Sequence, residues 1–254
     1  MPTENLTIVT SEGHELSGAL ELPTGLVRGA AVFAHCFTCT KQSKAATAVT
    51  RALAREGIAS LRFDFTGLGA SQGEFGRAGF ASDVEDLIAS AEHLIARFDC
   101  QILLVGHSLG GAAVLAAATE LGRAKVAAVA TIGAPSDVPH VLHNIKGDLA
   151  EIESKGEGDV TIGGRAFKLS KQFLDKTREI DLLDRIKDLR VPLMIMHSPT
   201  DDIVSVDHAS SLFMAAKHPK SFVSLDGADH LLLKNPKDAE YVAHVLAAWA
   251  HRYI

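Results

Sequence analysis

The chain has few cysteines, no excess of positive charge and no long apolar run. Three cysteines among 254 residues form a small, odd count, which argues against a disulfide framework and for a reducing compartment. A formal net charge of −6 provides no basic surface for nucleic acid. No apolar run is long enough to span a bilayer, and residues 1–5 lack the basic and apolar regions of a signal peptide. We therefore expect a cytoplasmic protein that binds neither nucleic acid nor membranes.

The remaining composition is that of an ordinary globular protein. Hydrophobic residues make up 47% and charged residues 22% of the chain, which is enough apolar material for a large core. Apolar runs alternate with helical patterns along the sequence, and this favours a mostly parallel sheet covered by helices on both faces. Because α/β folds of this length often form one unit, we expect a single domain over residues 1–254.

The hydrophobic pattern predicts eight strands in one sheet and four principal helices. The first two strands are expected to form an N-terminal hairpin. The expected strands are residues 6–9, 16–21, 30–34, 58–63, 102–105, 126–132, 193–196 and 221–225, and the expected helices are residues 43–55, 83–97, the run that begins near 112, and 238–251.

Residues 136–190 interrupt this alternation between the sixth and seventh expected strands. The segment is rich in charges of both signs, and residues 160–169 contain two alternating runs around Gly163 and Gly164. Such a pattern predicts a β-hairpin. We interpret the segment as a small lid over the functional site that contributes to substrate binding. The alternative is a peripheral excursion that has no contact with a substrate.

Residues 106–110, which read Gly-His-Ser-Leu-Gly, carry the strongest chemical signal of the chain. They follow an expected strand and precede an expected helix, and a serine at the tip of such a turn is typical of a nucleophile elbow. The glycines permit a strained turn, while the helix N-terminus favours negative charge beside the serine. The pattern therefore predicts that Ser108 is a nucleophile.

A second stretch, residues 69–73, matches the same glycine-serine-glycine pattern. It also follows an expected strand, at residues 58–63. The residues after it, 74–79, are interrupted by glycine and lack helical periodicity. We therefore interpret Ser71 as a loop serine and prefer Ser108.

A serine nucleophile needs a base, and the base needs an acid that holds it in the correct tautomer. In folds of this type the acid and the histidine follow the serine in that order. Asp201 and Asp202 follow the seventh strand, and because they are adjacent only one can point into the site. The alternative is that one or both cap the next helix. His230 follows the last strand and is the predicted base, whereas His107 must point away from Ser108.

An oxyanion formed on a carbonyl substrate needs two backbone N–H donors. The residue after the nucleophile, Leu109, is expected to supply one. The second is expected from the loop after residues 30–34.

Cys36 and Cys39 in the same loop form a C-x-x-C pair. Two possible functions are a redox switch and half of a metal site. A zinc site would want a second pair, but the remaining cysteine is Cys100 alone, and a thioredoxin-type motif would lie at a helix start. We therefore expect reduced, small packing residues and no metal site, although oxidation of the pair could disturb the site.

Taken together, these motifs resemble the α/β-hydrolase superfamily over nearly the whole chain. The matching parts are residues 35–37, 64–71 and 106–110, with Asp201 and His230. Residues 64–71 are similar to the family's glycine-rich loop after the fourth strand, which explains the second serine match. Cys36 stands where the family commonly has glycine. Residues 35–41 and 218–230 also look like the hydrolase half of bacterial proteins fused to an osmotically-inducible-protein-C-type peroxidase domain, here expected without that domain.

The resemblance implies an α/β-hydrolase fold, with a mostly parallel eight-stranded sheet, helices on both faces and a small lid. It also implies an esterase: Ser108 attacks an ester carbonyl, His230 takes the proton, Asp201 orients the imidazole, and the amides of Leu109 and Phe37 hold the oxyanion. Water activated by the histidine then releases the acyl-enzyme, without metal or cofactor. The small-molecule substrates expected are esters of short- to medium-chain acids, because the lid is too short for a long lipid tunnel, with aromatic feruloyl-type esters as an alternative.

Other activities on the same fold remain open. The same three residues could serve a thioesterase, an amidase or a perhydrolase. A non-catalytic small-molecule-binding protein is a further alternative. A haloalkane dehalogenase is disfavoured because it would need aspartate in place of Ser108.

Overall fold

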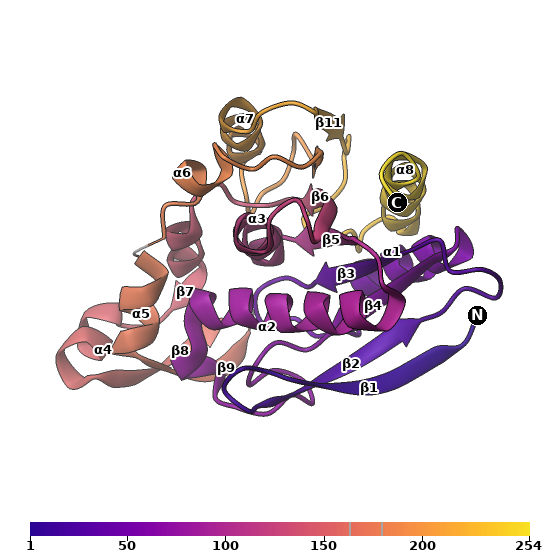
Figure 1. The fold of residues 1–254 in the computed structure, drawn as a ribbon. Helices are drawn as coiled ribbons and strands as arrows, with labels where there is room; N and C mark the ends of the chain where they lie inside the picture. Colours follow the sequence, from indigo (N-terminus) through magenta and orange to yellow (C-terminus); the bar gives the residue numbers. More distant parts are fainter. Residues whose placement is uncertain (163, 179) are drawn as a thin grey trace.

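The computed structural model describes residues 1–162, 164–178 and 180–254. A central eight-stranded sheet runs through the molecule in the order β1-β2-β4-β3-β5-β6-β10-β11 (Figure 1). The strands β4 to β11 in this order are parallel, and β2 is antiparallel to both β1 and β4. The predicted mostly parallel sheet is thus confirmed. Its strands are β1 Thr3–Val9, β2 Glu15–Glu21, β3 Gly29–Ala34, β4 Ile58–Phe63, β5 Ile102–His107, β6 Val126–Ile132, β10 Leu193–His197 and β11 Lys220–Ser224.

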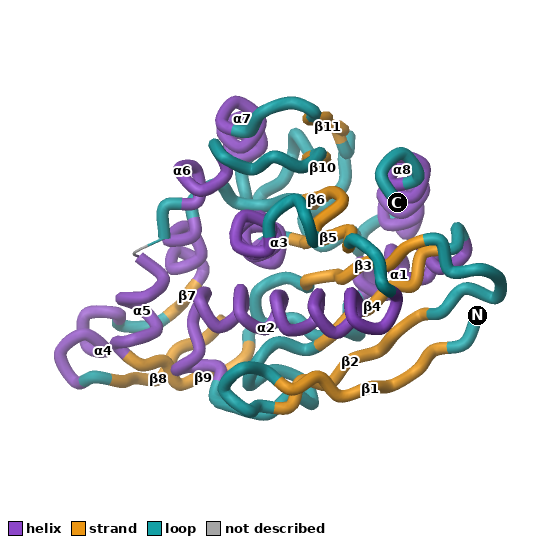
Figure 2. Tube along the Cα trace, in the orientation of Figure 1, coloured by secondary structure: helices purple, strands orange, loops and turns teal. Residues whose placement is uncertain are grey.

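Helices cover both faces of the sheet (Figure 2). On one face lie α1 (Lys44–Arg55) and α8 (Pro236–Ala250), and on the other lie α2 (Phe75–Phe98), α3 (Leu109–Leu121) and α7 (Val206–Ala215). Alternate residues of β5 enter the two cores: Leu104 packs with α2 and α3, whereas Leu103 and Val105 pack with α1 and α8. Because both faces are buried, the central strands are continuous apolar runs instead of alternating ones.

The interrupting segment 136–190 forms a small second sheet beside α2, at one end of the central sheet (Figure 1). Its hairpin consists of β8 and β9, which pair antiparallel, and the short β7 adds a third strand that the sequence pattern did not indicate. Gly163, expected in the turn of this hairpin, lies outside the described residues. The elements of the segment are η1 Val138–Asn144, β7 Ile145–Lys146, α4 Leu149–Lys155, β8 Glu157–Ile162, β9 Arg165–Ser170, α5 Lys171–Arg178 and α6 Leu182–Ile186.

The start of α2 differs from the sequence prediction. Residues 74–79 were expected to be non-helical, but the helix begins at Phe75 and bends at Gly79, which has φ 73° and ψ 177°. The first turn packs directly on β9, because a Cβ at Gly76 would overlap the carbonyl oxygen of Lys168. Ser170 Oγ also donates a hydrogen bond of 3.0 Å to the Gly76 carbonyl. Contact with a distant strand, which local periodicity does not encode, therefore stabilises this turn.

The longest helix is α2, with 24 residues. It carries charged side chains along most of its length, among them Arg77, Glu85 and Arg97. Among the helices of the described residues, none is both long and apolar enough to cross a membrane.

Candidate active site

Ser108 lies at the junction of β5 and α3, on the edge of the sheet where the parallel strands end. Its backbone has φ 56° and ψ −126°, a strained conformation for a residue with a side chain. The turn passes so close to β3 that a Cβ at Gly110 would overlap the carbonyl oxygens of Ala34 and His35. The glycine of the motif is thus required by packing, and the strained turn places the serine hydroxyl at the end of the strand.

Three side chains from different loops form a row of hydrogen bonds. Ser108 Oγ lies 2.9 Å from His230 Nε2, and His230 Nδ1 lies 2.8 Å from Asp201 Oδ2. A carboxylate only accepts hydrogen bonds, so Nδ1 carries the proton and Nε2 is free to accept from the serine hydroxyl. The structure therefore brings together the serine, histidine and aspartate that the sequence singled out.

The Asp201 side chain is 2% exposed and held at both oxygens. Oδ1 accepts hydrogen bonds of 2.9 Å from the backbone N–H groups of Ile203 and Val204. Burial alone would raise the pKa of Asp201, but the hydrogen bonds from His230 and from the backbone outweigh it and lower the pKa. Asp202 is exposed, and the helix that follows is capped by Ser205. Only Asp201 of the adjacent pair reaches His230.

Two buried histidines fix the loops that carry Asp201 and His230. His107 Nε2 donates a hydrogen bond of 2.7 Å to the carbonyl of His230, and His197 Nε2 donates one of 2.8 Å to the carbonyl of Val204. Burial lowers the pKa of His107 to about 4 and also lowers the pKa of His197. The ring of His107 lies 5.3 Å from that of His230, measured between centroids. The sequence predictions did not include His197. It is nevertheless the last residue of β10, as His107 is the last residue of β5.

The low pKa of His107 predicts a specific pH dependence of stability. Between pH 6.5 and 4 the unfolded chain binds a proton at this histidine that the folded protein does not, so wild type loses stability as the pH falls. His107→Gln keeps a donor but does not titrate. From pH 7 to pH 4 the stability of wild type relative to this variant should fall by up to about 3 kcal/mol. Urea unfolding of both proteins at the two pH values measures it, and a pH-independent difference would contradict it.

The loop after β3 carries one of the two proposed oxyanion donors. The backbone N–H groups of Phe37 and Leu109 donate no hydrogen bond within the described part of the chain. The far end of the loop is anchored by Lys41, whose backbone N–H donates to Asp64 Oδ1 at 2.7 Å and whose ammonium group pairs with Asp64 Oδ2. Two free N–H groups thus lie on the two segments that border Ser108, in an anchored loop and at a helix start.

The C-x-x-C pair corrects the sequence prediction. Cys36 and Cys39 are joined in a disulfide with a Cα–Cα distance of 5.3 Å, and Cys100 is free. The expectation of two reduced cysteines was therefore wrong. A tight turn brings the pair together, because the Cys39 N–H donates to the Cys36 carbonyl at 3.0 Å and Thr38 adopts a positive φ of 59°. A count of cysteines does not reveal such a turn. Because two of the three cysteines are joined, the count also no longer supports a reducing compartment.

Ser71, the serine of the second motif, is bound to backbone groups. Its hydroxyl donates to the carbonyl of Asp64 and accepts a hydrogen bond of 2.9 Å from the N–H of Ser17. It thereby ties the glycine-rich loop to the ends of β2 and β4.

The segment 136–190 contacts the loop that carries Phe37. Arg165 Nη1 in β9 donates a hydrogen bond of 2.7 Å to the Thr38 carbonyl. The ring of Phe75 lies 5.4 Å from Phe37 and 4.8 Å from Phe167 of the lid, measured between centroids. Between this loop, Phe75 and the start of α3 there is a small cavity with room for roughly one water molecule. Residues 165 and 167 of the segment are therefore packed near the loop that carries Phe37, while contact of the segment with a substrate stays a prediction.

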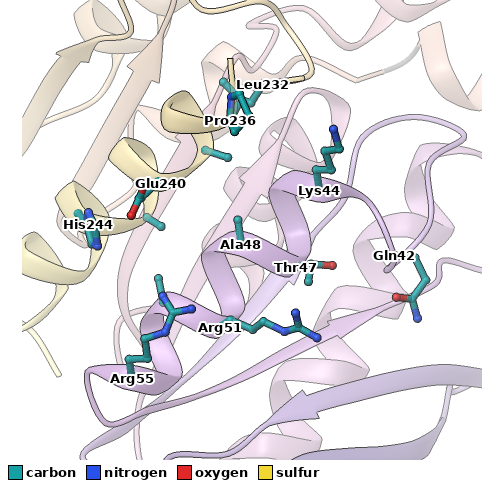
Figure 3. A pocket seen from close by; sticks show the side chains of 13 residues that line it. Gln42, Lys44, Thr47, Ala48, Arg51, Arg55, Leu232, Pro236, Glu240 and His244 are labelled. Atoms are coloured by element: carbon teal, nitrogen blue, oxygen red, sulfur yellow. The ribbon is translucent and has the colours of Figure 1, made fainter. Parts of the chain in front are cut away.

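A large groove lies elsewhere, between α1 and α8 (Figure 3). It measures about 600 Å³ and has a floor of alanines and a charged rim. On that rim, Arg51 and Arg55 face Glu240 and His244 across the groove (Figure 3). Ser108, His230 and Asp201 do not line it, so size alone does not identify the site.

Three further histidines gather near the base of the lid. The ring of His140 lies 4.8 Å from that of His208 and 5.5 Å from that of His143. His208 is bound to Ser136 through Nδ1 at 3.0 Å. Across residues 1–162, 164–178 and 180–254, no group of three or more histidine, cysteine or acidic side chains is arranged to hold a metal ion.

Comparison with known proteins agrees with this fold. Residues 27–241 match the model of the alpha/beta hydrolase family. The crystal structure of the esterase domain from a Rhodothermus marinus protein is 48% identical, with a TM-score of 0.79 over 100% of this chain and 99% of that one. Est1E from Butyrivibrio proteoclasticus, solved with ferulic acid bound, is 22% identical with a TM-score of 0.85, over 98% of each chain.

Curated relatives are more distant. The uncharacterized protein YfhR from Escherichia coli O157:H7 is 23% identical over 169 residues, which are 66% of this chain and 52% of YfhR. The chain thus spans about half the length of this relative. The family match covers most of the chain and agrees with the sheet order, the strained serine turn and the loops that follow the strands. The protein belongs to the alpha/beta hydrolase family.

Proposed function

We propose that this protein is a serine esterase that hydrolyses carboxylic esters through Ser108, His230 and Asp201. The observation that carries the proposal is the unbroken row of hydrogen bonds from the serine hydroxyl through both imidazole nitrogens to the carboxylate. As Ser108 Oγ attacks the ester carbonyl, its proton moves to His230 Nε2. Asp201 keeps the proton on Nδ1 and stabilises the imidazolium that forms.

The tetrahedral intermediate carries a negative oxygen that needs fixed donors. We assign this function to the free N–H groups of Phe37 and Leu109, supported by the N-terminus of α3. His230 then returns its proton to the departing alcohol oxygen, which leaves Ser108 acylated. A water molecule, deprotonated by His230, attacks the acyl-enzyme and regenerates the serine hydroxyl.

The substrates proposed are esters of short- to medium-chain acids. The confined space beside the oxyanion loop and the packed lid support a small acyl group. Aromatic acids are the second candidate, because Phe37, Phe75 and Phe167 lie together next to the oxyanion loop. The ferulic acid bound to Est1E, a protein of the same fold, supports this candidate as well. The name of the 48% identical neighbour, an esterase domain, supports ester hydrolysis.

We also propose that the chain corresponds to the hydrolase half of the bacterial fusions with an osmotically-inducible-protein-C-type domain. Two segments, residues 35–41 and 218–230, support this relationship. The Rhodothermus marinus neighbour is likewise the esterase domain of a protein, which is consistent with this relationship.

Hydrolysis of p-nitrophenyl esters with two to twelve acyl carbons tests the proposed function. We expect turnover with an optimum among the shorter chains, and a phosphonate ester should label the peptide that contains Ser108. Thioester and anilide analogues of the best acyl group separate an esterase from a thioesterase or an amidase. Absence of both hydrolysis and labelling would contradict the proposal and favour a binding protein.

A further inference from the structure

The disulfide between Cys36 and Cys39 encloses the proposed oxyanion donor Phe37. Only Phe37 and Thr38 lie between the two cysteines. Thr38 adopts a positive φ of 59°, which is unfavourable for a residue with a branched side chain and persists only where the surroundings enforce it. The disulfide is one constraint that enforces this conformation, and the backbone of Phe37 is part of the same closed ring.

The two sulfur atoms differ in access. Cys36 is 4% exposed and packs in the core, whereas Cys39 is half-buried at the surface of the loop. A thiolate from solution can therefore approach Cys39 and not Cys36. The free Cys100 precedes β5 at the opposite edge of the sheet, one strand length from Ser108.

Other contacts hold both the peptide before Phe37 and the segments to either side of it. The Cys36 carbonyl of that peptide accepts hydrogen bonds from the Cys39 N–H at 3.0 Å and from His35 Nδ1 at 2.9 Å. Arg165 binds the Thr38 carbonyl, and Lys41 binds Asp64 at the far end. Within the described chain neither contact involves the N–H of Phe37. When the sulfur–sulfur bond opens, these contacts still attach the loop to the molecule, but the turn that orients the Phe37 N–H is then held by hydrogen bonds alone and no longer by a covalent link.

We propose that Cys36 and Cys39 form a redox site that sets the position of the Phe37 N–H, and that reduction of this disulfide by a dithiol slows ester hydrolysis. This inference rests on the proposed esterase function. The inference adds to that function a redox-active modification site in the oxyanion loop. It also names dithiols as the class of reagent that modifies the site.

The exchange reaction follows from the access of the two sulfurs. A thiolate of the dithiol attacks Cys39 Sγ, the disulfide bond breaks, and Cys36 leaves as a thiolate that takes up a proton. The second thiol of the reagent then attacks the mixed disulfide and releases the Cys39 thiolate, which is also protonated. The pair gains two electrons and two protons, and the dithiol becomes a cyclic disulfide.

The effect should fall on kcat. The Phe37 N–H binds the oxygen only when negative charge develops on it, so displacement of this donor weakens the transition state more than the ground state. Loss of one oxyanion donor typically lowers kcat about 10²- to 10³-fold. Because the loop remains anchored at Lys41 and Thr38, we expect a decrease of roughly tenfold or more, with KM nearly unchanged.

The test uses the whole protein with Cys100→Ser, so that thiol counts report only on the pair. The variant is equilibrated with mixtures of reduced and oxidised dithiothreitol, and free thiols, kcat, KM and amide hydrogen exchange of residues 36–41 are measured. We expect kcat to fall and exchange to rise as two thiols per chain appear, and reoxidation should restore both. Cys36→Ser with Cys39→Ser should show the reduced behaviour at every ratio.

The outcomes distinguish this inference from the function on which it rests. Full reduction with unchanged kcat would overturn the redox site while leaving the esterase intact, as would serine variants as active as the oxidised protein. A rise in KM that accompanies the fall in kcat would indicate general loosening of the substrate site. This result would also overturn the proposed redox site. Inactivity of the oxidised protein towards all esters would remove the esterase and, with it, this inference.

Discussion

Replacement of Ser108 by alanine should abolish ester hydrolysis. Without the hydroxyl no acyl-enzyme can form, and His230 has no proton to accept at this position. In serine hydrolases the loss of the nucleophile lowers kcat by about 10⁶-fold, so only background hydrolysis should remain. The fold should persist, because the backbone of the strained turn is held by the Ile132 carbonyl, which accepts a hydrogen bond of 2.8 Å from the Ser108 N–H.

Ser71→Ala is the matched control. Ser71 belongs to the second glycine-serine-glycine stretch, and its hydroxyl binds only backbone groups of Asp64 and Ser17 in the described chain. Its loss should cost about 1 kcal/mol of stability and change kcat by less than a few-fold. Initial rates with a p-nitrophenyl ester and thermal melts of both variants are the measurements. Activity that survives in Ser108→Ala would exclude the proposed nucleophile.

Asp201→Asn should lower kcat by about 10⁴-fold. The amide nitrogen would donate to His230 Nδ1 and so move the imidazole proton to Nε2. In that tautomer the imidazole cannot take the proton of Ser108. The geometry of the loop should change little, because the remaining amide oxygen can still accept the hydrogen bonds that Ile203 and Val204 now donate to Oδ1.

Asp202→Asn provides the comparison, since Asp202 is adjacent but exposed. We expect its kcat to stay within a few-fold of wild type. The pH profile of kcat/KM gives a second readout, because a changed tautomer of His230 alters it and a loss of packing does not. Equal effects of the two substitutions would refute the assignment of Asp201 as the acid.

The sequence was sufficient for those parts of the site that depend on close backbone approach. The turn at Ser108 needs glycine at position 110 because the chain passes against β3. This requirement can be recognised in the sequence as the glycine-serine-glycine motif. The loop of His230 could be located because parallel strands end at one edge of the sheet. The choice of Asp201 rested on the resemblance to the family.

The sequence was insufficient where contacts between distant parts of the chain determine the local structure. The helical turn that begins at Phe75 depends on β9, about ninety residues later, so its own glycines suggested a loop. The disulfide depends on a turn with a positive φ at Thr38, which threonine seldom adopts. His197 was missed because its hydrogen bond to the Val204 carbonyl is visible only once the loop has folded.

The contact between Gly76 and Lys168 changes what counts as the lid. In the sequence the lid is residues 136–190, but in space the first turn of α2 is attached to β9 and separated from the rest of its helix by the bend at Gly79. A transplant of the lid between relatives would therefore have to carry two pieces of chain. The equivalent of residues 75–78 from the protein that supplies the lid must accompany the hairpin. Any residue larger than glycine at position 76 would collide with the transplanted strand that corresponds to β9.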